Sequence, residues 1–288
     1  MLNLIENFLD NANDFSLVGS WQNWFSEISS LTAPAPDGTL TAYVLKDASL
    51  STYVSRFYYV DGSDWLHGSE DSILFGMYVK PLDGSSSCAM KIHHGINSNS
   101  YDAWTVLTFS DNGSAAASSI AISNGSYHKI TPAADGWWLS EITLPNSGLS
   151  EDITVTLWPT AADVVAETGE LAVWQPYVTL LSQRLALNPV GLSHQAEANE
   201  KKHRTRDGSL FTYRFGESTS LDFGLNYIDK NTQDQLRRWW QEDARLLVVN
   251  DEGTLVMSCQ IRNKGVPVTS PVPPFNNLYA GKIKLETY

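Results

Sequence analysis

Two tryptophans that stand among polar residues are the side chains of this sequence best suited to chemistry. Trp65 lies in the segment Asp61-Gly62-Ser63-Asp64-Trp65-Leu66-His67, and Trp104 follows Asn99-Ser100-Tyr101-Asp102. Both segments have the composition of loops. An exposed indole can stack on the C–H groups of a sugar ring while neighbouring carboxylates and hydroxyls bind the sugar's hydroxyl groups. We therefore take Trp65, Tyr101, Asp102 and Trp104 as the candidate ligand-binding residues. Core packing is the competing interpretation for each tryptophan, and we favour it for those in apparent strands, Trp137, Trp138, Trp158 and Trp174.

Catalytic residues are not indicated by the sequence. A pair of acids would have to project into one cleft, and neither Glu141 nor the pair Glu70-Asp71 has a spacing that sets it apart from an acidic surface. The adjacent histidines, His93 and His94, point to opposite faces if they lie on a strand, so they do not suit one metal ion. No nucleophile, phosphate-binding or dinucleotide motif occurs. We expect no enzymatic activity, no catalytic residue, no cofactor and no metal, although the acidic loops leave a structural Ca²⁺ open.

Charge divides the chain into two parts. The net charge is −13 overall; residues 1–180 hold 5 Lys+Arg against 20 Asp+Glu, whereas residues 181–288 hold 14 against 12. The acidic first part argues against a nucleic-acid partner. No apolar run reaches the ~20 residues that span a bilayer, so membrane insertion is not expected. The two cysteines form no pair motif, and the N-terminus does not resemble a secretory signal; both features are typical of a chain that folds in the cytoplasm.

The first part is predicted to be mainly β, an antiparallel jelly roll or β-sandwich over residues 1–182. Short apolar or alternating segments are separated by Asn-Gly and Asp-Gly turns, the pattern of antiparallel strands. The predicted strands are Thr52–Tyr59, Ser72–Lys80, Ser87–His93, Ala103–Phe109, Ala117–Ile122, His128–Thr131, Trp137–Thr143, Ile153–Pro159 and Leu171–Val178.

The second part is predicted to be a small α+β domain over residues 204–288, joined to the first by a linker or arm at 183–203. Strands at 209–215 and 220–228 are expected to form a hairpin around 216–219. A helix follows over 232–244, capped by Asn231 or Thr232, with Leu236, Trp239 and Trp240 on one apolar face. Further strands are predicted at 245–249, 254–262 and 278–285.

A proline-rich loop, residues 264–277, precedes the last predicted strand. Proline stiffens an extended segment and lowers the entropy lost when it binds a neighbour. The loop is therefore the candidate assembly segment, although a plain surface loop explains it equally well. Its candidate residues are Pro267, Pro271, Pro273, Pro274 and Phe275.

The order of several phrases resembles bacteriophage tail and baseplate proteins that carry a carbohydrate-binding-module-like jelly roll. The first part has Asn3-Leu4-Ile5-Glu6-Asn7, then Trp21-Gln22-Asn23-Trp24, then Pro36-Asp37-Gly38-Thr39, and closes on Leu171-Ala172-Val173-Trp174-Gln175-Pro176-Tyr177. The second part is similar, more loosely, to small tail-type domains, through 208–213, 236–240 and 278–286. No set of sugar-contacting residues carries over with the resemblance.

The resemblance implies a structural component of the virion, assembled in the host cytoplasm. Its C-terminal domain would join copies of itself in a ring or other tail proteins, and its jelly roll would serve decoration or contact with a host surface glycan. Two other hypotheses stay open: a carbohydrate-active enzyme of the depolymerase type, and a free-standing glycan-binding module.

Overall fold

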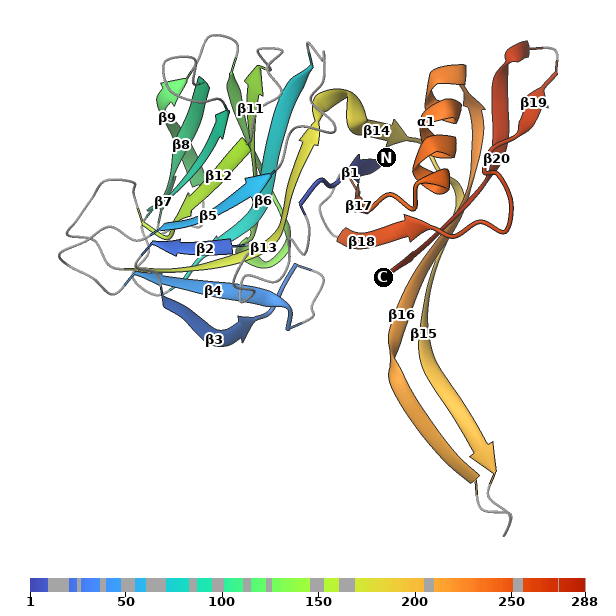
Figure 1. The fold of residues 1–288 in the computed structure, drawn as a ribbon, viewed down its shortest axis with the longest axis horizontal. Helices are drawn as coiled ribbons and strands as arrows, with labels where there is room; N and C mark the ends of the chain where they lie inside the picture. The colour runs from blue at the N-terminus through green and yellow to red at the C-terminus, as the bar shows by residue number, and fades with distance from the viewer. Residues whose placement is uncertain are drawn as a thin grey trace. The chain divides into compact units, whose positions relative to one another are not determined.

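A computed structural model describes fifteen segments of the 288-residue chain. They are residues 1–9, 21–24, 27–36, 40–47, 55–60, 71–82, 87–94, 101–110, 115–122, 126–145, 153–160, 169–204, 210–250, 256–273 and 275–287. The fold is mainly β, with antiparallel sheets and, in the described part of the chain, one α-helix (Figure 1). No helix in these segments has both the length and the apolar character needed to cross a membrane.

The chain forms two compact units whose boundary differs from the expected one. The sandwich unit comprises residues 7–184, and the sheet-helix unit comprises Met1–Glu6 with most of 185–288. The first six residues, expected in the jelly roll, therefore belong to the sheet of the other unit. Residues 183–203, expected as a linker or arm, are largely strand. Pairing with partners distant in sequence, which composition does not reveal, explains both differences.

The sandwich unit consists of two six-stranded antiparallel sheets. Its strands are β2 (Trp21–Trp24), β3 (Glu27–Ala33), β4 (Ala42–Asp47), β5 (Ser55–Val60), β6 (Ser72–Pro81), β7 (Ser87–His94), β8 (Tyr101–Phe109), β9 (Ala115–Ile122), β10 (Tyr127–Pro132), β11 (Trp138–Pro145), β12 (Ile153–Trp158) and β13 (Gly169–Leu180). One sheet has the order β10-β11-β6-β13-β4-β3, and the other has β2-β5-β12-β7-β8-β9. Each strand predicted from 52 to 178 has its counterpart among β5–β13, which confirms the sandwich.

The core of this unit lies between the two sheets, and its side chains come from alternate residues of the strands. Alternate residues of each strand point to the same face, so every second residue enters the core. From β6 these are Ile73, Phe75, Met77 and Val79, and they pack with the alternate residues of β7, β8, β11, β12 and β13. Each such side chain contributes about 1.5–3 kcal/mol by leaving water, so the pairing register is fixed.

The opposite face of the β6 sheet is also buried, around a carboxylate. Glu141 on β11 is 2% exposed and accepts hydrogen bonds from the Tyr177 hydroxyl (2.7 Å) and from Arg184 Nη1 (2.8 Å). The Tyr177 ring lies directly over Gly76, where an added Cβ would stand 2.2 Å from Cζ. Glycine is thus required at 76.

Two of the tryptophans predicted to be core residues, Trp137 and Trp174, are buried. The Trp137 N–H donates to Pro34 O, and the Trp174 N–H donates to Thr41 Oγ1.

One histidine is enclosed near the β10 edge. His128 Nε2 lies 3.0 Å from Ser140 Oγ, and Nδ1 lies 3.5 Å from Thr105 Oγ1. Burial disfavours the charged ring and lowers the pKa of His128 to about 4.

This histidine predicts acid sensitivity. In the unfolded chain it takes up a proton near pH 6.5, but in the folded chain only near pH 4, so the free energy of unfolding falls as the pH drops through this window. His128→Gln stays neutral. We expect the wild type to lose on the order of 2 kcal/mol more than this variant between pH 7 and pH 4. Urea unfolding at a series of pH values measures the difference, and parallel curves for the two proteins would contradict it.

The sheet-helix unit is one eight-stranded antiparallel sheet with helix α1. Its elements are β1 (Leu2–Glu6), β14 (Arg184–Leu187), β15 (Val190–Arg204), β16 (Leu210–Ile228), α1 (Lys230–Gln241), β17 (Leu246–Asn250), β18 (Val256–Ile261), β19 (Ser270–Val272) and β20 (Phe275–Thr287). The order is β14-β1-β17-β18-β20-β16-β15, and β19 pairs with β20.

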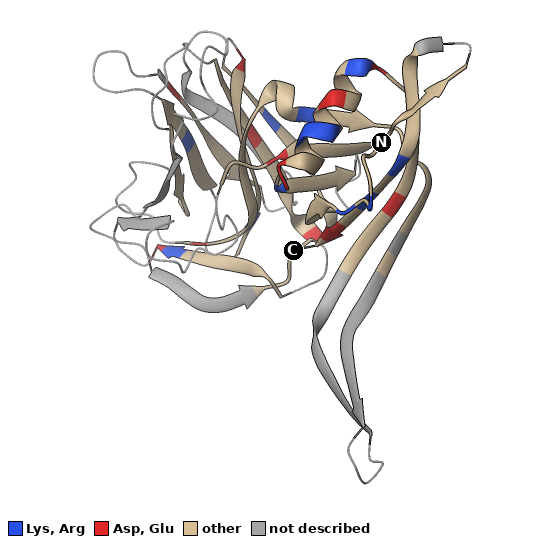
Figure 2. Cartoon of the chain, turned by 45° about the vertical axis from the view of Figure 1, so that its right-hand side comes forward, with Lys and Arg blue, Asp and Glu red and all other residues tan. Residues whose placement is uncertain are grey.

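The helix is close to its prediction, with a different cap. Asp229 caps the N-terminus by accepting a 2.7 Å hydrogen bond from Thr232 N, so the predicted caps were wrong. Leu236 and Trp239 are buried in the core of the unit and Trp240 packs against it, which confirms the apolar face. Charged residues of both signs lie along the helix (Figure 2), and Lys230 and Asp234 form an exposed i,i+4 ion pair. The helix ends at Gln241, followed by Asp243 in the left-handed region (φ 50°).

The expected hairpin around 216–219 is wrong. Strand β16 runs without interruption from Leu210 to Ile228 and pairs with β15; the pairs Glu197↔Ser218 and Ala198↔Glu217 fall on the expected turn. A register irregularity between Ala198 and Glu200 absorbs the local mismatch. Glycine and small polar residues allow a turn but do not compel one, because an extended partner supplies the same backbone hydrogen bonds.

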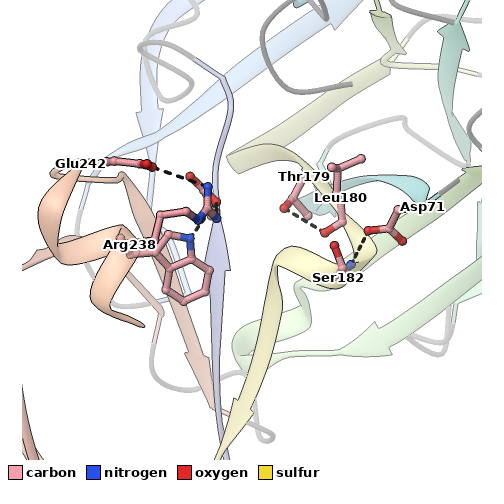
Figure 3. Close-up of polar contacts among 8 residues, drawn as sticks. Asp71, Thr179, Leu180, Ser182, Arg238 and Glu242 are labelled. Carbon is pink, nitrogen blue, oxygen red and sulfur yellow. Dashed lines mark hydrogen bonds and ion pairs between the residues drawn. The ribbon is translucent and has the colours of Figure 1, made fainter. Parts of the chain in front are cut away.

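A buried carboxylate connects β1 to the helix. Strand β1 pairs with β17, and Glu6, 7% exposed, accepts 2.7 Å hydrogen bonds from Arg238 Nη2 and Trp239 Nε1. Arg238 also approaches Glu242 at 3.5 Å, an exposed i,i+4 ion pair (Figure 3). The N-terminal strand thus supplies the acceptor for two donors of the helix.

Removal of the Glu6 carboxylate is expected to destabilise the sheet-helix unit. Glu6→Ala leaves the buried Trp239 N–H without its acceptor, which costs about 2–4 kcal/mol together with the lost ion pair. Glu242→Ala is the matched control, because it removes only the exposed partner of Arg238 and costs roughly 0.5 kcal/mol or less. Amide hydrogen exchange across β1, β17 and α1 measures the change in this unit. Equal effects of the two substitutions would contradict the assignment.

Candidate functional site

The candidate site is one face of the sheet formed by β5, β12, β7, β8 and their neighbours, the face turned away from the core. Strands β12, β7 and β8 lie side by side (Figure 1). Their inward residues belong to the core, among them Met90, Leu107 and Val155. The intervening residues form what we call the outer face: Ala89, Lys91 and His93 of β7, Asp102, Trp104 and Val106 of β8, and Thr154, Thr156 and Trp158 of β12.

Two tryptophans meet on the outer face. The ring centroids of Trp104 and Trp158 are 6.2 Å apart, with the rings inclined by 60°. The register places Trp158 opposite Ala89 and Ala89 opposite Val106, and both indoles pack on these two buried side chains. A small residue at 89 leaves room for the rings to approach across β7. Both tryptophans are partly exposed, so indole surface remains available to a ligand.

The Trp158 N–H is a donor without a described acceptor. Its Nε1 atom is inaccessible to solvent and has no hydrogen-bond partner among the residues that the structure describes. A buried donor left unpaired costs about 1–3 kcal/mol. An acceptor oxygen brought by a ligand would recover that cost if the rings shifted to admit it.

A charged cluster adjoins the tryptophans. Asp102 Oδ1 lies 2.5 Å from His93 Nδ1, and Asp102 Oδ2 lies 3.0 Å from Lys91 Nζ. The side chains of Lys91, His93 and Asp102 are 28%, 31% and 41% exposed. Burial alone would raise the pKa of Asp102, but hydrogen bonds from His93 and Lys91 and the positive charge of Lys91 outweigh it and hold that pKa below its usual value. Asp102 is therefore a carboxylate, positioned by its two partners and still open to solvent.

The structure brings together two of the four predicted binding residues. Asp102 and Trp104 share the outer face, two residues apart on β8. Trp104 was expected in a loop and lies instead in a strand, because 101–109 pairs with β7 along its length. Tyr101 is the first residue of β8, but its side chain lies outside the described residues, as does Trp65.

The sequence prediction missed three important members of the outer face. Trp158 was assigned to the core, yet it alternates with the buried Ile153, Val155 and Leu157 and so shares the face of the threonines at 154 and 156. Lys91 and His93 alternate in the same way with Met90 and Ile92 on β7. Alternation within these two strands was the signal that identifies them.

The acids considered for catalysis have structural roles. Glu141 is engaged by Tyr177 and Arg184, as described above. Asp71 accepts hydrogen bonds from the backbone N–H groups of Ser72 (2.8 Å) and Ser182 (2.7 Å; Figure 3), and Glu70 lies outside the described residues. His94 is fully buried while His93 is on the outer face, so the two histidines do point apart. No three His, Cys, Asp or Glu residues in the described segments are grouped as metal ligands.

Described residues of the proline-rich loop pack against the sheet-helix unit to which the loop belongs. Pro267 is buried. The Val268 backbone lies against Gly281, and Val268 O accepts a 2.7 Å hydrogen bond from Gln233 Nε2. Pro271 lies in β19, which pairs with β20. Pro273 is exposed, Pro274 lies outside the described residues, and Phe275 begins β20 with its side chain undescribed.

Comparison with known proteins finds no matching family model and no curated protein that matches by sequence. Among solved structures, the chain is similar to the enzymatically active domain of tailspike protein 4 of bacteriophage CBA120, at 11% identity and a TM-score of 0.35; the match covers 61% of this chain and only 21% of that one.

It is also similar to a family 11 carbohydrate-binding module from Clostridium thermocellum in complex with a β-1,3-1,4-mixed-linked tetrasaccharide, at 14% identity and a TM-score of 0.33, over 62% of this chain and 96% of that one. The binding domain of botulinum neurotoxin serotype C1 matches 91% of this chain and 74% of its own, at 8% identity and a TM-score of 0.28. We draw no functional inference from likenesses at this level.

Proposed function

We propose that the sandwich unit is a glycan-binding module and that the outer face of β7, β8 and β12 is its binding surface. The observation that carries the proposal is the juxtaposition, on one sheet face, of the partly exposed Trp104 and Trp158 with the charged cluster of Lys91, His93 and Asp102. Neither indole is needed to seal the main core, because that core lies on the other side of the sheet.

The two groups of side chains match the two surfaces of a sugar. A pyranose presents C–H groups on its faces, which stack on an indole, and hydroxyl groups around its rim, which need both donors and acceptors. Lys91 donates and Asp102 accepts, and each already has its orientation fixed by the other. The hydroxyls of Thr154 and Thr156 can do either. The face therefore offers an apolar platform beside polar groups of both kinds.

The proposed activity is binding without turnover. The described part of the outer face has one carboxylate, Asp102, whereas glycoside hydrolysis uses two acids on either side of the scissile bond. Because Asp102 is paired with Lys91 and His93, it is suited to holding a hydroxyl group.

Substitution of either tryptophan is expected to weaken binding. On an array of microbial, plant and host glycans, the intact chain should bind a defined subset of polysaccharides. Trp104→Ala and Trp158→Ala should each lower affinity for those glycans by roughly 10- to 100-fold, since a stacked tryptophan contributes about 1.5–3 kcal/mol. Trp158→Phe keeps a ring without the N–H and should lose less. Titration calorimetry with the best array ligand gives the values.

Tyr127→Ala is the matched control, because Tyr127 is an exposed aromatic residue on β10, in the other sheet. Its affinity should equal that of the wild type. Unchanged binding by both Trp104→Ala and Trp158→Ala, with their folds intact by circular dichroism, would remove the outer face from the function.

The absence of turnover has its own test. Incubation of the chain with each glycan that it binds should release no new reducing ends over a day. Release that persists in Asp102→Asn would place a catalytic site elsewhere on the chain, and release that this substitution abolishes would favour the depolymerase-like hypothesis.

We further propose, from the resemblance of the sequence phrases to phage tail proteins, that the module is displayed on a virion through the sheet-helix unit. The insertion of the sandwich between β1 and β14 supports this, because both ends of the binding unit are then held by the other unit. Electron microscopy of the native assembly tests it. Particles that carry the chain in a tail would agree, and a chain found only free in solution would not.

A further inference from the structure

The outer face is poor in charge although the unit that carries it is strongly acidic. Residues 7–184, which form nearly all of the sandwich unit, hold 19 Asp+Glu against 6 Lys+Arg. On the described strands of this sheet, the pairing register places Lys91, His93 and Asp102 on the outer face and no other acidic or basic residue. The flanking positions in that register are Gln22 on β2, Phe57 and Tyr59 on β5, and Ala116, Ser118 and Ala121 on β9. Within these strands, charge on the outer face is confined to one cluster.

The charges of that cluster compensate one another. Each carboxylate oxygen of Asp102 has its own donor, with Lys91 Nζ at 3.0 Å from Oδ2 and His93 Nδ1 at 2.5 Å from Oδ1. The ammonium group balances the carboxylate, so the charges of the three side chains sum to zero when the imidazole is neutral. The cluster is thus a source of hydrogen bonds rather than of an uncompensated charge.

An anionic sugar would meet repulsion as well as attraction at this cluster. A ligand carboxylate or sulfate that reached Lys91 would come within about 6 Å of the Asp102 carboxylate, because each contact to the ammonium group is about 3 Å long. Repulsion between the two like charges then offsets the attraction of the ammonium group. The net negative charge of the unit acts in the same direction on a chain that carries many anionic groups.

A hydroxyl group meets no such repulsion. It can accept from Lys91 and donate to Asp102 while the ion pair between these two side chains stays intact. The ammonium group of an amino sugar would instead approach the ammonium group of Lys91, and both oxygens of Asp102 already have donors. The cluster therefore favours an uncharged ligand over an ion of either sign.

We propose that the outer face selects uncharged glycans and rejects those that carry carboxylate, sulfate, phosphate or free amino groups. The inference rests on the proposed glycan-binding function and adds the class of ligand to it. Asp102 is the specificity-determining residue, because its carboxylate keeps the Lys91 ammonium group from acting as an anion-binding site. Trp104 and Trp158 supply the stacking surface, and the cluster supplies the discrimination.

The glycan array gives the first test. The glycans bound by the intact chain should lack ionised groups, and affinity for the best of them should change less than about twofold between about 0.05 M and about 0.5 M NaCl, because salt screens only charges. Bound glycans that are mainly anionic or cationic overturn the selection and leave the binding function standing. An array on which nothing is bound refutes the binding function itself, and this inference with it.

A matched set of ligands gives the second test. Oxidation of the primary hydroxyl groups of the best array oligosaccharide to carboxylates should weaken its binding to the wild type by about tenfold or more in titration calorimetry. The methyl ester of the oxidised oligosaccharide is uncharged again and should bind within about threefold of the parent. Equal binding of the parent and its oxidised form overturns the proposal, as does an ester that binds no better than the acid.

Substitution of Asp102 tests its role in the selection. Asp102→Asn leaves Lys91 uncompensated, so the ratio of affinities for the parent and the oxidised oligosaccharide should fall by about fivefold or more. Asp135→Asn is the matched control, because it makes the same charge change at an exposed position between β10 and β11, in the other sheet. Asparagine also tolerates the left-handed backbone of residue 135 (φ 55°). The control should keep the wild-type ratio. A ratio that Asp102→Asn leaves unchanged, or that both substitutions lower equally, overturns the proposal.

Discussion

The two-residue alternation of β7, β8 and β12 is the constraint from which the candidate site follows. Met90, Leu107 and Val155 are held in the core between the sheets, and a shift of one residue would exchange the two faces of each strand. The cost of exposing several such side chains, about 1.5–3 kcal/mol each, is far greater than any single polar contact on the other face. The core therefore determines that Trp104, Trp158 and Asp102 share the outer face, whatever they do there.

The same register gives the outer face its internal geometry. Ala89 lies between Trp158 on one side and Val106 on the other, so the smallest side chain of the region stands where the two indoles converge. Two residues further along β7, Lys91 lies opposite Trp104. Two residues beyond Lys91, His93 lies opposite Asp102. The result is an apolar end and a charged end on one surface, joined without an intervening loop. Rigid strands, rather than mobile segments, position the groups that we propose contact the sugar.

The path of the chain joins the two units through the ends of the sandwich. Asn7 Oδ1 accepts hydrogen bonds from Leu9 N and Val178 N, and its Nδ2 donates to Pro176 O, so the start and the end of the sandwich unit are tied to each other. Immediately before Asn7, Glu6 anchors β1 to the helix of the sheet-helix unit. Leu2 pairs with Asn250 across almost the whole sequence. This pairing places Leu2, Leu4 and Ile5 in the interior of the unit.

Local pattern predicted most of the sandwich and little of what depends on distant pairing. Turn residues and alternation located β5–β13, and the spacing of Leu236, Trp239 and Trp240 located the helix face. The place of β1 could not be predicted, because Leu2–Glu6 is equally compatible with either unit until β17 is known as its partner. Strand β16 was predicted as two strands joined by a turn for the same reason, because the sequence of its partner β15 has the composition of a charged linker.

In the candidate site, Asp102 and Trp104 were predicted from residue type and a polar sequence context. Trp158 was assigned to the core instead, because a tryptophan in a strand is more often a core residue. Only the alternation with Ile153, Val155 and Leu157 shows which face it occupies.

A crystal structure of the chain with its best array oligosaccharide tests the central claim most directly. The account predicts a sugar ring stacked on Trp104 or Trp158, with its hydroxyl groups within hydrogen-bond distance of Lys91 or Asp102. An oligosaccharide bound elsewhere, for example in the groove of about 580 Å³ lined by Asp222, Gly224 and Lys282 in the sheet-helix unit, with the outer face bare, would contradict it.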